Sequence, residues 1–548
     1  MNVCTANSVW KKAALVPPLL LALWLLTDDE KTLRDNSHHL AVWTALNRHP
    51  PSWRVFRALL ELNLLLFGAA LSMHVWITTV GSHVVGILLF QQPQEQQQQQ
   101  QSRMPRTYQP LSVQEEEMDT LDPNEDLLDA DCDSDGEVES PPRELEPPSA
   151  SSICSAALDL LLLILICLVL FTLSSAEGGR FIDGVPDNLT PLQSMASVAA
   201  PVFPLLLFLA TLTLTLFPWN RRRHFWIVLS YTIGAPFYNV TFRDGFLGDI
   251  LTSSVRPLQD LCFTSFYILS GLQGWWTKSY SIDEAATPIE HSWILRTCLL
   301  PACMVSPLWW RFSQNLRQAY DTKQRWPYLG NALKYLVAAE VAMFGVFSPA
   351  RKQHTTFLLA FIGATLYQVW WDVFMDWELL ELKGGKAKLR SKRLFSSKIL
   401  YRTILVINFL LRFCWTLSFM PQRYLTKAGV LQTTSDFTKF LGPAIASAEI
   451  IRRTLWGLLR FELEAIKSCG EEETVKAQLK RCSDATEDEG IEMQAMKLDD
   501  EVDIKGSLFG LYNDLSGKSD LTILRELVVW ATIFCSCGIL AAAHRDTY

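Results

Sequence analysis

Residues 160–173 read Leu-Leu-Leu-Leu-Ile-Leu-Ile-Cys-Leu-Val-Leu-Phe-Thr-Leu, and the apolar stretch around them extends over 153–175. An α-helix needs about 20 apolar residues to cross the hydrocarbon core of a bilayer. It also satisfies its own backbone hydrogen bonds, which lipid cannot do. The stretch therefore predicts a transmembrane helix.

Further apolar stretches of similar length predict a polytopic protein. They lie at 13–27, 55–78, 198–217, 250–275, 293–312, 329–348, 355–377, 399–420 and 438–458. The last run, 523–543, is either an eleventh span or a helix that lies on the bundle. The sequence thus predicts an all-α membrane helix bundle with about ten transmembrane helices.

The basic stretches of the chain predict its orientation, because lysine and arginine collect on the cytosolic side of a membrane. Three of them, 221–223, 311–325 and 383–393, fall on one side only if the interrupted apolar run 225–243 does not cross. We therefore interpret 225–243 as interfacial or re-entrant and place the N-terminus in the cytosol. The same topology puts Asn188, in the acceptor sequence Asn-Leu-Thr, in the lumen as a candidate glycosylation site.

The composition also indicates a membrane protein. Of the 548 residues 49% are hydrophobic and only 19% are charged, against about 25% in a typical globular protein. The net charge of −8 is concentrated in 91–152, where sixteen acidic and three basic residues give −13 and leave +5 for the rest. A nucleic-acid binder, a secreted disulfide scaffold and a simple cytosolic enzyme are excluded. The twelve cysteines lack the paired spacing of a zinc site, so we expect no metal and no cofactor.

We divide the chain into six parts. The acidic insert buries too little apolar surface to fold, and we expect it to be disordered in the cytosol. The parts are N-terminal membrane helices (1–90), a disordered Gln-rich and acidic insert (91–152), membrane helices with the interfacial segment (153–243), a transport core (244–470), an acidic flexible segment (471–522) and a C-terminal hydrophobic helix (523–548).

Ionisable side chains inside the predicted spans are the strongest functional signal, because each costs about 2.5–3.5 kcal/mol at the bilayer centre. Asp372 and Asp376 are four residues apart on an apolar helix, so we expect them to face the same way. The remaining candidates are Asp249, Lys334 with the adjacent Tyr335, Arg412, Arg452 and Arg453.

Four cations against three aspartates leave a slight positive excess, which suits a small oxyanion. Arginine binds phosphate or sulfate oxygens bidentately, and lysine adds a point charge. The aspartates would orient the arginines and keep the affinity modest, so that the ion can leave again. The alternative is a set of internal salt bridges that fix helix packing. Arg460, Glu462 and Glu464, beyond the last of these spans, are interpreted as an ordinary charged helix end.

Five sequence strings occur in order between residues 321 and 462. They are Asp-Thr-Lys-Gln-Arg-Trp-Pro (321–327), Gly-Asn-Ala-Leu-Lys-Tyr (330–335), Trp-Asp-Val-Phe-Met-Asp-Trp (371–377), Leu-Arg-Phe-Cys-Trp-Thr (411–416) and Glu-Ile-Ile-Arg-Arg-Thr-Leu-Trp-Gly-Leu-Leu-Arg-Phe-Glu (449–462). Together they resemble the EXS domain, the membrane domain of the eukaryotic phosphate exporters that include the xenotropic and polytropic retrovirus receptor. The resemblance implies phosphate-pathway roles for Asp249, Lys334, Tyr335, Asp372, Asp376, Arg412, Arg452 and Arg453, and a gate role for Trp415.

Two departures from the family pattern bear on function. The exporters have an arginine directly after Asp-Thr-Lys, whereas this chain has Gln324 there and Arg325 next. Neighbours on a helix differ by about 100°, so whether Arg325 reaches the same ion is left open. The chain also starts with a span and leaves no room for the SPX domain that senses inositol pyrophosphates. It therefore resembles the branch without SPX, like the yeast protein required for retention of endoplasmic reticulum and Golgi residents.

This branch implies a Golgi membrane transporter, ahead of the endoplasmic reticulum or plasma membrane. It would return lumenal phosphate, a by-product of glycosylation, to the cytosol and so support glycosylation and protein retention. The expected partners are inorganic phosphate and the lipid bilayer, with glycosyltransferases, sorting adaptors and a second copy of the chain as further candidates. A non-transporting sorting factor for Golgi glycosyltransferases is the alternative. We disfavour an intramembrane enzyme, because the nearby cations would repel a metal held by Asp372 and Asp376.

Overall fold

The structure, a computed structural model, describes residues 3–25, 50–90, 147–179, 202–277, 292–347, 355–383, 386–414, 434–484 and 512–543. The candidate residues Asn188 and Trp415 lie outside these ranges, and so does nearly all of the acidic insert 91–152.

Helices form nearly all of the described secondary structure. In chain order they are α1 (Val3–Ala13), α2 (Val16–Leu25), α4 (Pro50–Val80), α5 (Ser82–Leu89), α7 (Ala150–Gly179), α9 (Val202–Leu216), α10 (Trp219–Ile233), α11 (Phe242–Thr252), α12 (Val255–Thr277), α14 (Leu300–Thr322), α15 (Tyr328–Phe347), α16 (Thr355–Trp371), α17 (Lys398–Arg412), α19 (Thr434–Asp484) and α21 (Asp520–Ala543). Two π-helical turns, η3 (Ile294–Leu299) and η5 (Asp372–Asp376), precede α14 and follow α16.

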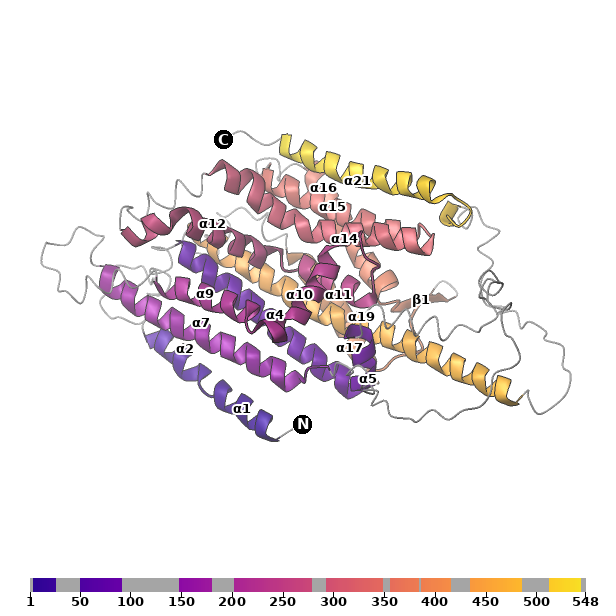
Figure 1. Ribbon diagram of the computed structural model, residues 1–548, viewed down its shortest axis with the longest axis horizontal. Helices are drawn as coiled ribbons and strands as arrows, with labels where there is room; N and C mark the ends of the chain where they lie inside the picture. Colours follow the sequence, from indigo (N-terminus) through magenta and orange to yellow (C-terminus); the bar gives the residue numbers. More distant parts are fainter. Residues whose placement is uncertain are drawn as a thin grey trace, which may run out of the picture.

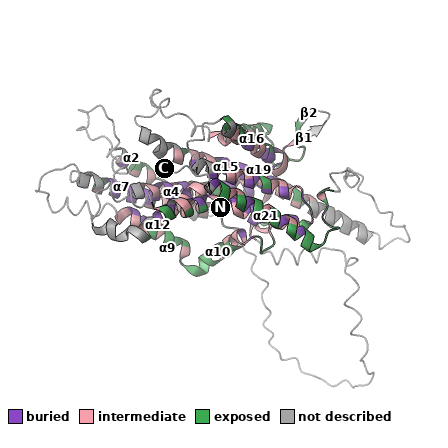
Figure 2. Cartoon of the chain, turned by 90° about the horizontal axis from the view of Figure 1, so that it is seen from above, coloured by how far each residue is buried: buried purple, intermediate pink, exposed green. Residues whose placement is uncertain are grey.

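The long helices lie side by side, and α19 runs through the middle of the bundle next to α4 (Figure 1). Three large apolar clusters hold them together, and a smaller one, around Phe263 and Leu295, joins α12 to η3. The first joins α14, α15 and α21, the second joins α4, α5, α11, η5, α17 and α19, and the third joins α2, α4, α7 and α9. Buried residues accordingly lie on the inward faces of the helices (Figure 2).

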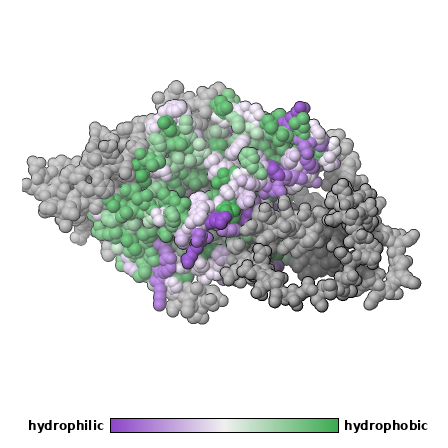
Figure 3. Space-filling model, viewed as in Figure 1, coloured by the Kyte–Doolittle hydropathy of each residue, from purple (hydrophilic) through white to green (hydrophobic). Residues whose placement is uncertain are grey.

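Large apolar side chains are also exposed on the outside, among them Leu206 and Leu209 of α9 and Val528 and Val529 of α21. Hydrophobic residues cover much of the described surface in Figure 3. Such a surface suits lipid, and it follows that the protein is an integral membrane protein.

Within the described ranges, four helices are long and apolar enough to cross a bilayer. They are Trp53–Val80, Ala150–Ser174, Leu358–Asp376 and Asp520–Ala541. Helices α9 and α10 add a fifth candidate if the pair, bent by 85°, counts as one broken span. A bend of this size occurs in a broken span or in a re-entrant loop, so the interfacial or re-entrant interpretation of 225–243 stays a prediction. The last of the four helices is α21, which favours a span for 523–543, while the total of about ten spans stays a prediction.

The N-terminal boundary differs from the sequence prediction. The expected span 13–27 is divided between α1, which ends at Ala13, and α2, which has 10 residues. Ten residues of helix cover about 15 Å, roughly half of the hydrocarbon core. Pro17 and Pro18 explain the break, since proline is favoured in the first turn of a new helix.

The structure of three further segments also differs from the sequence prediction. The stretch 311–325, which we interpreted as a cytosolic loop, belongs largely to α14. Hydropathy alone assigns such a polar stretch to a loop, but a helix can bury its polar face inside a bundle. The basic stretch 383–393 begins in an antiparallel hairpin of β1 (Leu380–Lys383) and β2 (Lys386–Leu389). The first part of 471–522 is helical, since α19 continues to Asp484.

Candidate functional site

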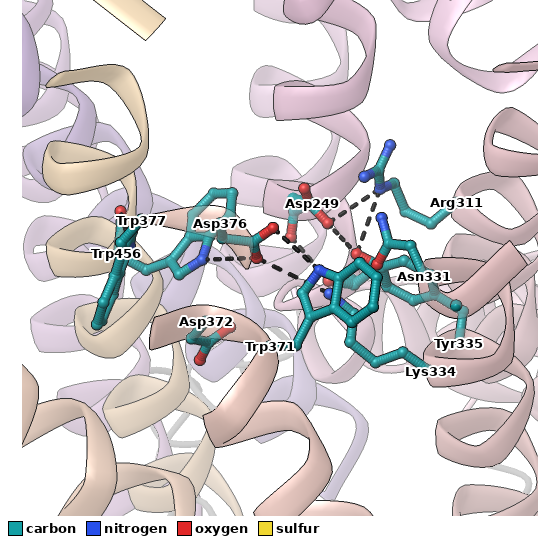
Figure 4. A network of polar contacts seen from close by, with 12 residues as sticks. Asp249, Arg311, Asn331, Lys334, Tyr335, Trp371, Asp372, Asp376, Trp377 and Trp456 are labelled. Atoms are coloured by element: carbon teal, nitrogen blue, oxygen red, sulfur yellow. Dashed lines mark hydrogen bonds and ion pairs between the residues drawn. The ribbon is translucent and has the colours of Figure 1, made fainter. Parts of the chain in front are cut away.

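The eight candidate residues that the sequence identified lie on α11, α15, η5, α17 and α19, in one region of the bundle interior. Figure 4 shows Asp249, Lys334, Tyr335, Asp372 and Asp376 of this set. Asp249, Lys334, Tyr335 and Arg453 are each no more than 7% exposed, and Arg452 is fully buried. Asp249 and Asp372 each lie in the electrostatic field of both Lys334 and Arg453. The structure therefore brings together the side chains that the sequence could only list.

Asp249 forms the first part of this region. It accepts hydrogen bonds from Arg311 Nε at 2.9 Å and from the Tyr335 hydroxyl. The arginine continues to Gln314, whose amide group donates to the backbone of α11 at Asp244. A Cβ atom at Gly248 would lie 2.5 Å from Arg311 Cδ, so only glycine permits this close approach of α11 and α14.

Asp376 forms the second part. Its two carboxylate oxygens accept indole hydrogen bonds from Trp371 at 3.1 Å and from Trp456 at 3.2 Å. Lys334 Nζ lies 3.9 Å from Asp376 Oδ2, which is an ion pair beyond hydrogen-bond distance. The ammonium group also lies over the rings of Tyr335 and Trp371, at 4.7 and 5.3 Å from their centroids. Aromatic faces thus supply part of its stabilisation.

Asp372 forms the third part and faces α17 and α19. It accepts hydrogen bonds from Arg412 Nη2 at 2.7 Å and from Asn408 Nδ2 at 3.1 Å. Arg452 Nη1 lies 3.5 Å away and is held by Glu449, which accepts two hydrogen bonds from this arginine at 2.8 and 2.6 Å. Within this third part, Asp372 Oδ1 and Arg412 Nε are buried and have no hydrogen-bond partner among the described residues.

Arg453 differs from its neighbour Arg452. Its guanidinium donates to the hydroxyls of Ser253 at 2.8 Å and Thr252 at 3.2 Å, and it lies 4.6 Å from the ring centroid of Trp456. Among the ion pairs of the described residues, none contains Arg453. It is therefore a buried cation without a close carboxylate.

The two carboxylates Asp372 and Asp376 do not face the same way, contrary to our expectation. They lie in the π-helical turn η5, where the Trp377 amide donates to the Asp372 carbonyl at 3.0 Å. This turn closes over five residues rather than four. Residues four apart consequently diverge, with Asp376 directed toward Lys334 and Asp372 directed away from it (Figure 4).

Arg325 does not join the cluster. It donates to Glu526 of α21 at 2.6 and 2.7 Å and to the Tyr512 carbonyl, so it fastens the C-terminal helix to the α14–α15 connection. The interpretation of Glu462 as part of an ordinary charged helix end was wrong. Its side chain is 2% exposed, accepts a hydrogen bond from the Leu394 amide at 2.8 Å and forms an ion pair with Arg390. Its burial follows from the folding of the hairpin segment over α19, which hydropathy does not predict.

Sequence reasoning also missed two charged members of the cluster. Arg311 was assigned to a cytosolic loop, because its neighbours Arg317, Lys323 and Arg325 are basic. Glu449 is the first residue of the sequence string 449–462. Its position three residues before Arg452 was the signal that could have predicted an ion pair between them. With both added, the cluster has five cations and four carboxylates. The single positive excess is therefore unchanged.

The fold and the site define an integral membrane helix bundle with a net-cationic charged cluster in its interior. More specifically, the chain belongs to the EXS family, whose match covers residues 52–466.

The relatives are similar over about half of this chain. The xenotropic and polytropic retrovirus receptor 1 homolog of Xenopus laevis is 29% identical, with 50% of this chain and 39% of the relative covered. Phosphate transporter PHO1 homolog 9 of Arabidopsis thaliana is 28% identical, with 55% and 36% covered. Solute carrier family 53 member 1 of Homo sapiens is 29% identical, with 46% and 37% covered. The alignments thus span less than half the length of these relatives.

Proposed function

We propose that this protein transports inorganic phosphate through the bundle, and that the buried cluster is the phosphate site. Membership of the EXS family and the similarity to a relative named as a phosphate transporter support the substrate. The cluster supplies guanidinium and ammonium donors, which suit a tetrahedral oxyanion.

The observation that carries the proposal is the incomplete pairing of Arg453 and Lys334. Arg311, Arg412 and Arg452 each have a carboxylate oxygen within 2.9 Å. Arg453 donates to hydroxyls, and Lys334 lies 3.9 Å from its carboxylate. Charges that are costly to bury and lack a close counterion suit a site that a mobile anion completes.

The roles within the site follow from these contacts. Arg453, Lys334 and the unpartnered Arg412 Nε would contact phosphate oxygens. Asp249 and Asp372 would orient the arginines, and Tyr335 would hold Asp249. A carboxylate would also accept a hydrogen bond from a protonated phosphate oxygen. These carboxylates oppose tight anion binding, which a transporter needs for release.

The proposal extends to the Golgi membrane, with a cytosolic N-terminus and about ten spans. There the protein would return lumenal phosphate from glycosylation to the cytosol. That step would support glycosylation and the retention of resident proteins. This part rests on the resemblance to the yeast retention protein. Phosphate content of isolated Golgi vesicles tests it: vesicles lacking the protein should retain more lumenal phosphate than wild-type vesicles.

Flux of radiolabelled phosphate in liposomes tests the transport function itself. Lys334→Met should lower the flux at least about tenfold, because a hydrogen bond to a charged group contributes about 1.5–3 kcal/mol. Lys467→Met is the matched control, since Lys467 pairs with Glu378 at the surface and its side chain is 47% exposed. Equal flux from wild type and Lys334→Met would contradict the assigned site.

A further inference from the structure

A second buried charge cluster lies between α4 and α12, outside the phosphate site. Asp260, fully buried, accepts a bidentate pair of hydrogen bonds from Arg57. Arg54 Nη1 lies 3.5 Å from the same carboxylate, and Arg256 Nε lies 3.9 Å from it. Three guanidinium groups therefore surround one aspartate, and Asp260 is more than neutralised.

A second carboxyl group, Glu61, stands beside this cluster. It lies one helical turn after Arg57 on α4, within the membrane-spanning stretch Trp53–Val80, and it is 3% exposed. Neither of its carboxyl oxygens has a hydrogen-bond partner within the described part of the chain. A buried ionised carboxylate without hydrogen bonds is strongly disfavoured, whereas the protonated form carries no charge to solvate.

The charged groups around Glu61 come from the helices packed against α4. Asp260 and Arg256 of α12 and Arg57 of α4 itself dominate its surroundings. Helix α9 has no ionisable side chain, and Asp159 of α7 pairs with Lys12 at 2.6 Å. On α19, Glu449, Arg452 and Arg453 are bound within the phosphate cluster, and on α5 the sole ionisable side chain, His83, is exposed.

We propose that Glu61 is a proton-binding site, and that its protonation is coupled to phosphate passage. Loading forms one O–H bond on a Glu61 carboxyl oxygen with a proton from a hydronium ion, and unloading returns the proton to water. The coupling, unlike the proton site, rests on the proposed transport function.

The structure offers a route from Glu61 to the phosphate cluster. Arg256 Nε is buried without a hydrogen-bond partner in the described residues, so an ionised Glu61 would compete with Asp260 for this guanidinium. Arg256 stands three residues after Ser253, which accepts from Arg453 and donates to Glu449. Movement of Arg256 would thereby act on α12 next to the hydroxyl that holds Arg453.

Infrared difference spectra of the purified protein test the proton site without any transport. Between about pH 6, where carboxyl groups of ordinary pKa are already ionised, and alkaline pH, wild type should show loss of the carbonyl stretch of a protonated carboxylic acid. Glu61→Gln, a neutral isostere, should lose the Glu61 component of this band and keep only the component from Glu340, whose Oε1 is also buried without a hydrogen-bond partner in the described residues. Glu340→Gln, which removes a carboxyl from α15, should retain the Glu61 component, and so should Glu61→Asp. A band that persists unchanged in Glu61→Gln would overturn the proposal.

Phosphate flux in liposomes under an imposed pH gradient tests the coupling. Phosphate itself changes protonation with pH, so the response of Glu61→Gln is the baseline. A gradient of one pH unit corresponds to about a factor of ten in the phosphate ratio across the membrane per coupled proton, so the response is measured as this ratio at steady state. Wild type and Glu340→Gln should exceed the baseline by about that factor. Equal responses in wild type and Glu61→Gln, with flux intact, would overturn the coupling and leave phosphate transport standing. If wild type moves no phosphate, transport fails, and the infrared band still decides the proton site.

Discussion

The adjacent arginines Arg452 and Arg453 should differ in how much stability each loses when it is replaced by methionine. Arg452 is fully buried and donates to Glu449 at 2.8 and 2.6 Å and to Asn408 at 3.0 Å. Arg453 donates only to the hydroxyls of Ser253 and Thr252 in the described structure. Methionine replaces either side chain with a neutral one of similar length, so the two variants separate structural charge from functional charge.

The contacts set the expected magnitudes. Arg452→Met leaves Glu449 buried without its arginine, and breaking a buried pair costs about 3–5 kcal/mol of unfolding free energy. Arg453→Met loses two hydrogen bonds to a charged group, about 1.5–3 kcal/mol each. It also removes an unpaired buried charge that costs about 2.5–3.5 kcal/mol. We therefore expect Arg453→Met to lose about 1–2 kcal/mol, clearly less than Arg452→Met.

Two measurements on the same preparations decide the outcome. Denaturant unfolding in mixed micelles gives the stability, and phosphate flux in liposomes is normalised to folded protein. Arg453→Met should fold and lose at least about tenfold in flux, which corresponds to about 1.4 kcal/mol of lost phosphate interaction. Arg460→Met on the same helix is the control, since Arg460 pairs with Glu464 at 3.2 Å and its side chain is 25% exposed. Equal destabilisation by Arg453→Met and Arg452→Met, with unchanged flux per folded molecule, would refute the functional role of Arg453.

Two other predictions concern packing. Gly248→Ala should cost about 1–3 kcal/mol of stability in thermal unfolding, because the new methyl group would meet Arg311 Cδ at 2.5 Å. Gly363→Ala is the control: its new methyl group would have no atom within 4 Å, so this variant should be neutral or stabilising. A double-mutant cycle on Arg325→Ala and Glu526→Ala should give a coupling free energy of about 1 kcal/mol. This coupling should fall with added salt, because the two side chains are 8% and 27% exposed. A coupling of zero would show that this contact does not hold α21 in place.

The helical membrane bundle could be predicted from the sequence, whereas the total of about ten spans and the roles of the site residues stay predictions. Long apolar stretches predict membrane helices because hydropathy is a property of the stretch itself. A lysine, an arginine or an aspartate inside such a stretch predicts a buried functional group for the same reason. Seven of the eight candidates, all except Tyr335, were found in this way, and they lie in one cluster of charges. Arg311 was missed because a charged residue at a span end looks like part of a loop.

The partners of these residues could not be predicted. Tyr335 and Asp249 are separated by 86 residues, and Arg453 and Ser253 by 200, so their contacts depend on how the helices pack and rotate. The π-helical turn at Asp372–Asp376 shows the same limit on a smaller scale, since one extra residue in a turn redirects both carboxylates.

The sequence by itself determined that the chain forms membrane helices and that cations and carboxylates lie inside them, because hydropathy and charge are local properties. Only the tertiary structure decided that Arg452 is neutralised by Glu449, that Arg453 is left with hydroxyls and that Arg325 binds α21. Neutralisation is a matter of distance between groups on different turns and helices, and packing fixes that distance.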